Sequence, residues 1–298
     1  MSILHAIILG IVQGATEFAP VSSSGHLILV PWLFQWNELL SNPALNKTFD
    51  VALHMGTLLG ALVYFRADVV KYVKAFGRSV AHRSISSPDE RLAWVLIIGT
   101  IPGGLFGVLF ESTIEEKLGQ PWLIAVMLAV FGIVLYVVDL KMKSTRGIDD
   151  LTPKDGVVLG FAQALALQPG VSRSGITMTG ARLLGMDREA AARFSFLLAM
   201  PIIAGAGAHK AFTLAQTGFG GNGSAFAWGF IASAVSGFVV IWGLLGYLRK
   251  HSFKAFMIYR LLVAGIVFGV ILTGTRPATI PQTDTSTAHT SAIATLNR

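Results

Sequence analysis

Residues 10–26 read Gly-Ile-Val-Gln-Gly-Ala-Thr-Glu-Phe-Ala-Pro-Val-Ser-Ser-Ser-Gly-His, and residues 160–176 read Gly-Phe-Ala-Gln-Ala-Leu-Ala-Leu-Gln-Pro-Gly-Val-Ser-Arg-Ser-Gly-Ile. Aligned without a gap, the two stretches share a glycine, a glutamine, a Val-Ser pair and a Ser-Gly pair. They differ where Ser23 corresponds to Arg173, and the first stretch alone ends in His26. Hydroxyl, glycine and charged residues thus recur 150 positions apart in apolar surroundings, which indicates an internal repeat.

The composition indicates a protein that lies within a lipid bilayer. Hydrophobic residues make up 53% of the chain, charged residues only 13%, and the mean hydropathy is +0.64. Soluble domains carry about 25% charged residues. The net charge of +7 is therefore assigned to cytoplasmic loops, and no nucleic-acid partner is expected. The chain has no cysteine, which excludes disulfides and thiol chemistry.

Each repeated stretch lies between apolar runs that are too short to cross a membrane. A helical span needs roughly 20 apolar residues. The first stretch is flanked by runs at 3–12 and 27–36, and the second by runs at 157–167 and 177–184. Half-length runs around a polar tip with proline and glycine predict a re-entrant helical hairpin. Such irregular backbone is tolerated at membrane depth only where protein or water satisfies it.

The remaining apolar runs predict six transmembrane helices, so the fold class is an all-α integral membrane protein. They cover residues 49–65, 92–110, 122–138, 194–208, 225–248 and 257–272. A basic loop follows the first span. We expect one membrane domain, 1–274, made of halves 1–150 and 151–274, followed by a polar disordered tail, 275–298.

The two halves are predicted to have opposite orientations in the membrane. Each half contains three spans and one hairpin, and an odd number of spans inverts the second half relative to the first. The charges agree, because 17 of the 23 Lys and Arg residues then fall on one side, which is taken as cytoplasmic. Both termini are accordingly expected outside the cytoplasm. In inverted repeats with broken helices, binding sites lie near the midplane where the repeats meet.

Because the hairpins enter from opposite sides, their tips are expected to meet in one intramembrane site. Ionisable residues at that depth are costly and indicate function. The candidate residues are Gln13, Glu17, Ser22, Ser23, Ser24 and His26 from the first stretch, and Ser172, Arg173, Ser174 and Thr177 from the second.

The chemistry of these residues suits a phosphate group. Arginine is a fixed cation with a fork of five donors, and serine turns at helix N-termini form anion sites. His26 can act as acid, base or nucleophile. Glu17, with Gln13 one helical turn earlier, can hold a divalent cation or orient His26.

Structural roles remain as alternatives. A serine turn can simply cap a helix, an intramembrane histidine can simply be hydrogen-bonded, and Glu17 can be the partner of Arg173. Asp50 and His54 are placed near the outer surface, in direct or supporting roles. Three arginines, at 182, 188 and 193, are read as cytoplasmic anchors, and Arg260 is expected to snorkel towards the surface.

Two motifs resemble those of the bacterial undecaprenyl-diphosphate phosphatase family, known for bacitracin resistance. Residues 13–26 resemble the first signature, a Glu or Gln, three residues, a Glu, and then Pro-Val-Ser-Ser-x-Gly-His. Residues 169–177 resemble the second, Pro-Gly-x-Ser-Arg-Ser-Gly-x-Thr, and 194–201 is also similar. The resemblance covers about residues 1–272. Many members have Glu where this chain has Gln13, and this difference would either weaken metal binding or move it onto Glu17 alone.

The resemblance implies hydrolysis of undecaprenyl diphosphate to the monophosphate and phosphate, which recycles the lipid carrier for cell-wall synthesis. It implies a multi-pass protein of the bacterial plasma membrane whose active site faces the periplasm and uses Mg²⁺ or Ca²⁺. Glu17, Ser23, His26 and Arg173 would be catalytic, with Ser23 or His26 as nucleophile. Phosphate would be bound by Ser22, Ser24, Ser172, Ser174 and Thr177. The oligomeric state is left open, and a homodimer is one possibility.

Two other classes of protein share parts of this pattern. Broken helices in inverted repeats are also typical of transporters, so a carrier or flippase for a polyprenyl phosphate is the first alternative. A carrier would not need a Ser and a His three residues apart opposite an Arg, which favours hydrolysis. The second alternative is an acid-phosphatase fold in the membrane. Its later Ser-Arg segment, with a further His and Asp, is missing from the chain.

Overall fold

The computed structural model describes residues 1–40, 42–217 and 221–280, and in residues 43–44, 111–117 and 209–217 only the backbone is described. Most of the predicted tail and part of the loop 218–224 lie outside the described residues. The helices are α1 (Ile3–Glu17), α2 (Ser23–Phe34), α3 (Asn37–Leu40), α4 (Pro43–Tyr64), α5 (Arg66–His82), α6 (Pro88–Lys117), α7 (Pro121–Lys141), η1 (Ile148–Asp150), α8 (Pro153–Leu165), α9 (Arg173–Leu183), α10 (Arg188–Thr217), α11 (Gly223–Leu248) and α12 (Lys254–Leu272).

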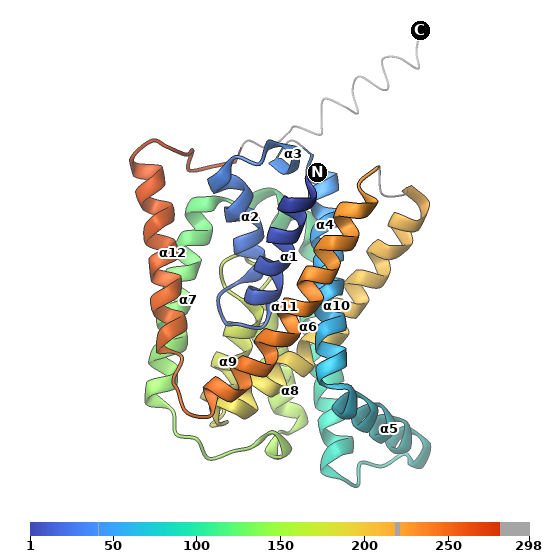
Figure 1. Ribbon diagram of the computed structural model, residues 1–298. Coiled ribbons are helices and arrows are strands. Elements are labelled where there is room, and N and C mark those ends of the chain that lie inside the picture. Colours follow the sequence, from blue (N-terminus) through green and yellow to red (C-terminus); the bar gives the residue numbers. More distant parts are fainter. Residues whose placement is uncertain (41, 218–220, 281–298) are drawn as a thin grey trace.

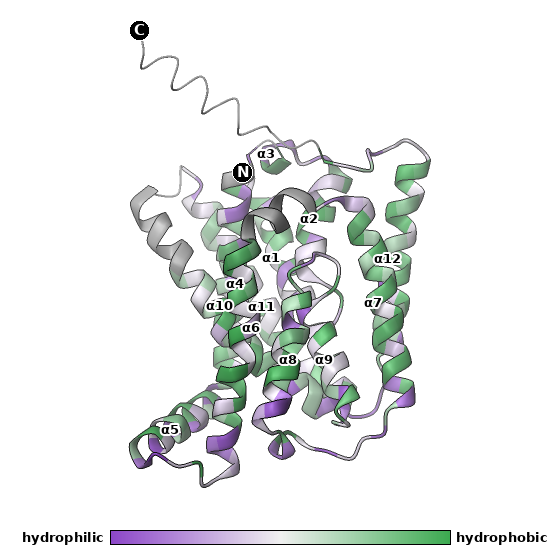
Figure 2. Ribbon diagram, turned by 180° about the vertical axis from the view of Figure 1, so that it is seen from behind, coloured by the Kyte–Doolittle hydropathy of each residue, from purple (hydrophilic) through white to green (hydrophobic). Residues whose placement is uncertain are grey.

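The predicted spans all form long helices. In the described part of the chain, five helices, α6, α7, α10, α11 and α12, are long and apolar enough to cross a membrane. The helices α4 and α5, bent by 84° relative to each other, pass the same test only as a pair. Apolar residues run along the length of α7 and α12, while hydrophilic residues gather towards the end of the bundle that carries α5 (Figure 2). The protein is therefore an all-helical, multi-pass membrane protein, as the composition predicted.

The region after the first span, predicted as a basic loop, contains the helix α5. Tyr72, Ala75 and Ser79 are spaced by three and four residues, so they share one helical face, and all three are buried. This face packs against α6, where the Trp94 indole donates a hydrogen bond of 2.9 Å to Ser79 Oγ. The expectation of a loop was wrong because the charged residues occupy only the other faces of a regular helix.

Two hairpins of short helices enter the bundle from opposite ends (Figure 1). The first is α1–α2 with its tip at residues 18–22, and the second is α8–α9 with its tip at residues 166–172. Each tip ends on a serine with the same unusual positive φ, which is 74° for Ser22 and 76° for Ser172. Each serine also caps the following helix, since its Oγ accepts a hydrogen bond from the amide of Gly25 or Gly175.

Close packing of each hairpin depends on a glycine at the same repeat position. A methyl group on Gly10 would lie 2.4 Å from Gly229 O of α11, and one on Gly160 would lie 2.7 Å from Gly99 O of α6. Small residues let membrane helices approach to backbone contact. Hence α1 packs on α11 as α8 packs on α6.

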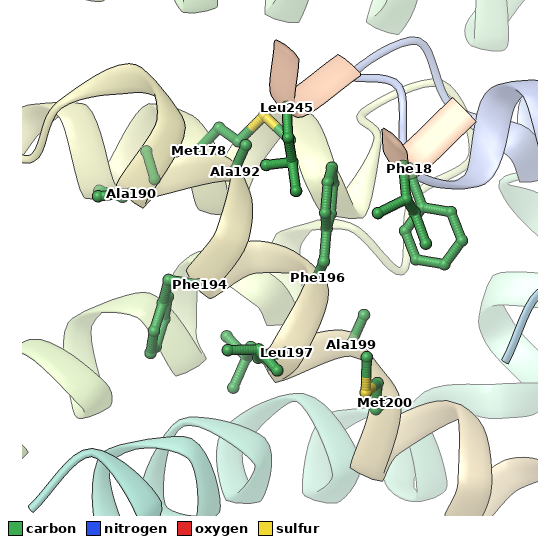
Figure 3. Close-up of a cluster of buried hydrophobic side chains, with 14 of the residues drawn as sticks. Phe18, Met178, Ala190, Ala192, Phe194, Phe196, Leu197, Ala199, Met200 and Leu245 are labelled. Atoms are coloured by element: carbon green, nitrogen blue, oxygen red, sulfur yellow. The ribbon is translucent and has the colours of Figure 1, made fainter. Parts of the chain in front are cut away.

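The central core lies around α10 and reaches the first tip. Figure 3 shows the buried side chains of α10 between Ala190 and Met200, with Phe18 and Leu245 on the same cluster. Phe18 follows the last residue of α1, and its ring meets Phe196 edge to face with centroids 5.2 Å apart. The first tip is thus anchored in the core by an apolar side chain next to Glu17.

Two of the three arginines predicted to be cytoplasmic anchors, Arg182 and Arg188, instead converge on one buried carboxylate. Arg182 is 1% exposed, and its Nε donates to Asp139 Oδ1 over 3.0 Å. Arg188 Nε donates to the same oxygen over 2.8 Å. A buried carboxylate requires such partners. The network joins α7, α9 and α10, and Arg193 separately pairs with Asp68 of α5 at 2.6 Å.

Candidate functional site

The two hairpin tips touch, as the repeat predicted. The backbone amide of Gly170 donates to Ser22 Oγ over 3.0 Å. In the other direction, Ser174 Oγ donates to Ala19 O over 2.9 Å. Each tip therefore satisfies a polar group of the other, which keeps irregular backbone stable in the middle of an apolar bundle.

A buried cluster of charged and polar side chains is centred on Glu17. Arg173 Nη2 of the second hairpin donates to Glu17 Oε1. Ser23 Oγ donates to Glu17 Oε2 over 2.5 Å, and Gln13 Nε2 donates to the same oxygen over 2.9 Å. Ser23 and Arg173, which occupy the same position of the two repeats, thus meet on one carboxylate. Sequence reasoning predicted that these residues come together.

His54 also belongs to this cluster. Its Nε2 lies 3.6 Å from Glu17 Oε2, and its Nδ1 donates to Asp50 O over 2.7 Å. The sequence placed His54 near the outer surface and left its role open. Spacing could have located it, because residues 50 and 54 lie one turn apart on a span, and a polar face there points to the interior.

A pocket of about 290 Å³ opens beside the cluster. Its polar walls come from the tips and their helices, and its apolar walls come mainly from α10 and the end of α8. The polar lining residues are Glu17, Ser22, Ser23, Ser24, His54, Gln163, Ser172 and Arg173, and the apolar ones include Val51, Leu167, Ile202, Ile203 and Ala206. This division suits an amphipathic molecule with an anionic head.

Three of the five predicted phosphate-binding residues line the pocket, namely Ser22, Ser24 and Ser172. The other two have structural hydrogen bonds. Ser174 bonds to the first tip, as described above, and Thr177 Oγ1 lies 2.6 Å from Ser195 Oγ of α10 and donates to Arg173 O over 2.7 Å. Both hold α9 in place.

His26 is not among the residues that line the pocket. It is buried, its Nδ1 donates to Ser22 O over 2.7 Å, and its Nε2 lies 2.8 Å from Tyr259 Oη. Both ring nitrogens are therefore engaged away from Glu17. A direct catalytic role of His26 stays a prediction, and the observed contacts connect the start of α2 with α12.

Arg260 corrects another expectation, because it does not snorkel. The side chain is 0% exposed and lies between the two tips and α7. Position alone could not reveal this, since an arginine near the end of an apolar helix can reach either the surface or the interior. The signal that favoured the interior was the presence of a charge inside a span.

Helix electrostatics favour an anion in the pocket. Both α2 and α9 begin at the tips, at Ser23 and Arg173, so the positive ends of their dipoles point to the site. The positive φ of Ser22 and Ser172 is rarely adopted by residues other than glycine, and such conformations cluster at functional sites. Two helix N-termini and one arginine thus surround a single buried carboxylate.

The donors present suit a divalent cation only in part. Gln13 Oε1 is buried without a hydrogen-bond partner, while the Nε2 of the same amide donates to Glu17 Oε2. Within the described residues, no group of three or more His, Cys, Asp or Glu side chains is placed to bind a metal. Mg²⁺ commonly takes one or two protein carboxylates and completes its shell with phosphates and water. Glu17 and Gln13 fit such a substrate-assisted site.

The fold and the pocket define an integral membrane protein with an intramembrane site for an amphipathic anion. The family model described as "Bacitracin resistance protein BacA" matches residues 6–267. The chain belongs to this family, in agreement with the resemblance noted from its two motifs.

Relatives named undecaprenyl-diphosphatase match nearly the whole chain. The protein of Pelobacter propionicus is 46% identical over 276 residues, which are 92% of this chain and 99% of the relative. That of Moorella thermoacetica is 46% identical over 271 residues, 91% of this chain and 98% of the relative. That of Desulforudis audaxviator is 45% identical over 272 residues, 91% and 99% of the two chains.

Proposed function

We propose that the protein hydrolyses undecaprenyl diphosphate to undecaprenyl phosphate and inorganic phosphate. The family and the names of the relatives supply the substrate. The observation that carries the proposal is the cluster in which Ser23 and Arg173 meet on Glu17 beside a half-polar pocket. Recycling of the lipid carrier for cell-wall synthesis, and resistance to bacitracin, follow from this reaction.

The pocket orients the substrate by its two kinds of wall. The diphosphate lies against Arg173 and the serines of the tips, where the helix N-termini also favour negative charge. The first isoprene units lie against Ile202 and Ile203, and the rest of the chain follows the apolar helix surfaces. A bidentate guanidinium fork neutralises the charge on the terminal phosphoryl group.

Ser23 is the nucleophile that the geometry favours. Its hydroxyl donates to Glu17 Oε2, so the carboxylate takes the proton as Oγ bonds to the terminal phosphorus and the P–O bond to the lipid phosphate breaks. Glu17 then passes this proton to the departing lipid phosphate. Water attacks the phosphoserine and gives a proton to Glu17, which hands it to Ser23 Oγ as the serine P–O bond breaks and phosphate leaves. Electrostatic stabilisation by Arg173 carries most of the rate in such transfers.

Glu17 and Gln13 would hold Mg²⁺ or Ca²⁺ together with diphosphate oxygens. The ion would add positive charge at the transferring phosphoryl group. Its support is the unpartnered Oε1 of Gln13, the residue whose amide nitrogen bonds to the Glu17 carboxylate.

We place the protein in the bacterial plasma membrane with both termini and the pocket on the periplasmic side. The support is the charge asymmetry of the loops and the opposite entry of the two hairpins. Because the chain has no cysteine, a Ser2→Cys variant carries a single thiol. A membrane-impermeant maleimide should label it in intact spheroplasts, and labelling only after lysis would contradict this orientation.

The reaction is tested with purified protein and undecaprenyl diphosphate. We expect undecaprenyl phosphate and inorganic phosphate in equal amounts. Movement of the lipid across vesicle membranes without any phosphate release would contradict the proposal and favour a carrier.

A further inference from the structure

The guanidinium of Arg260 lies where the two tips and α7 come together. It donates to five main-chain oxygens, and every hydrogen bond that Arg260 makes in the described part of the chain is of this kind. The acceptors are Leu128 O at 2.8 Å, Met127 O at 3.2 Å, Pro20 O at 3.2 Å, Gly170 O at 2.7 Å and Val171 O at 3.1 Å.

We propose that Arg260 is a positioning residue for the phosphatase site, which holds the two tips at the separation that brings Glu17 to Arg173. This inference rests on the proposed function for its effect on rate. Pro20 lies three residues after Glu17, and Val171 lies two residues before Arg173. A guanidinium that bonds both segments therefore sets the distance between the catalytic groups without touching either.

Arginine is the residue that this position requires. Its planar group carries five donors, whereas the ammonium of lysine carries three. The five carbonyls come from three segments, so no smaller donor reaches them all. A buried carbonyl left without a partner costs about 1–3 kcal/mol.

Two glycines leave the space that the Arg260 side chain occupies. A methyl group on Gly132 of α7 would lie 3.2 Å from Arg260 Cβ, and one on Gly175 of α9 would lie 3.1 Å from Arg260 Nη1. Gly175 belongs to the Ser-Gly pair that the repeated stretches share. Its place in the second stretch is thus explained by the arginine as well as by the turn.

The neighbouring Tyr259 adds a second contact from α12 to the first hairpin. Its hydroxyl lies 2.8 Å from His26 Nε2, and the two rings stack with centroids 5.6 Å apart. Consecutive residues of α12 therefore bind both sides of the site. His26 therefore helps to hold the first hairpin against α12.

The test measures the separation of the hairpins directly. Because the native chain has no cysteine, spin labels at Ile11→Cys on α1 and Leu165→Cys on α8 are unique. Both native side chains are exposed, at 50% and 56%, and neither belongs to the site. Electron–electron distance distributions and kcat are compared in this background with and without Arg260→Gln, Arg260→Lys and, as a matched control, Arg249→Gln. Arg249 lies at the end of α11, where it pairs with Glu189.

We expect one narrow distance with Arg260, a broad or shifted distribution in Arg260→Gln, an intermediate one in Arg260→Lys, and no change in Arg249→Gln. A misplacement of about 1 Å lowers the rate on the order of 10²-fold. The fall in kcat should therefore be largest in Arg260→Gln, smaller in Arg260→Lys and absent in Arg249→Gln. If Arg260→Gln does not fold, Gly132→Ala supplies the test, because the three atoms nearest to its methyl group, at 3.2–3.3 Å, all belong to Arg260.

An unchanged distribution in both Arg260 variants would overturn the inference, and so would an equal change in Arg249→Gln. A fall in melting temperature with native kcat per folded molecule and a native distance would assign Arg260 a purely structural role. If the parent protein released no phosphate, the proposed function would fail, whereas the distances would still decide whether Arg260 positions the tips.

Discussion

Replacement of Glu17 by glutamine removes the charge at the centre of the site and keeps its shape. The carboxylate is buried, and Arg173, Ser23 and Gln13 all donate to it. Breaking a buried ion pair from one side costs about 3–5 kcal/mol, because the other charge remains buried and unpaired. At about 2–4 °C per kcal/mol for a chain of this size, the melting temperature should fall on the order of 10 °C.

Removal of both charges should restore stability without restoring activity. In the double variant Glu17→Gln/Arg173→Met no unpaired charge remains, so most of the lost melting temperature should return. Phosphate release should stay about 10²–10³-fold below that of the native protein in both variants. The matched control is Glu189→Gln, since its pair with Arg249 is exposed to solvent and screened, so its loss should leave the melting temperature nearly unchanged.

The assays are thermal unfolding in detergent and colorimetric phosphate release from a C15 prenyl diphosphate. Native rates in Glu17→Gln would refute the assignment of this carboxylate as the base. A double variant less stable than the single one would refute the ion pair as the source of the instability.

Further predictions concern the hairpins, the nucleophile and the cation. Gly10→Ala should lower the melting temperature, because its methyl group would lie 2.4 Å from Gly229 O, whereas Gly104→Ala, which faces open space, should be neutral. Ser23→Ala should reduce kcat at least about 10²-fold and His26→Ala much less, because Ser23 lines the pocket and His26 does not. A larger loss of phosphate release in His26→Ala than in Ser23→Ala would favour His26 as the nucleophile. A chelator should abolish activity and added Mg²⁺ or Ca²⁺ restore it, and full activity with chelator would exclude the cation.

Sequence alone could predict the hairpins and their meeting. Short apolar runs around polar tips cannot cross a bilayer, and the odd number of spans in each half inverts the second tip. An ion pair between Glu17 and Arg173 is one of the alternatives that the sequence leaves open, since a buried charge needs a partner, and the structure shows this contact.

The rest depended on which face of each helix turns inward. The span that carries Arg260 is apolar all round, so periodicity does not distinguish its interior side. Arg182 was misread for a similar reason, because its partner Asp139 lies 43 residues away at the end of another helix. The sequence did not predict the position of α5, because α5 is held against α6 by the hydrogen bond from Trp94 to Ser79, and no local sequence pattern specifies such a contact.

The most direct test of the account is the turnover of undecaprenyl diphosphate by the purified Arg173→Ala variant beside the native protein. Arg173 comes from the second tip, while Glu17 and Ser23 come from the first hairpin, so this residue tests whether both are needed. We predict a fall in kcat of about 10²–10³-fold in folded protein. Turnover within a few-fold of the native rate would contradict a single site built from both tips.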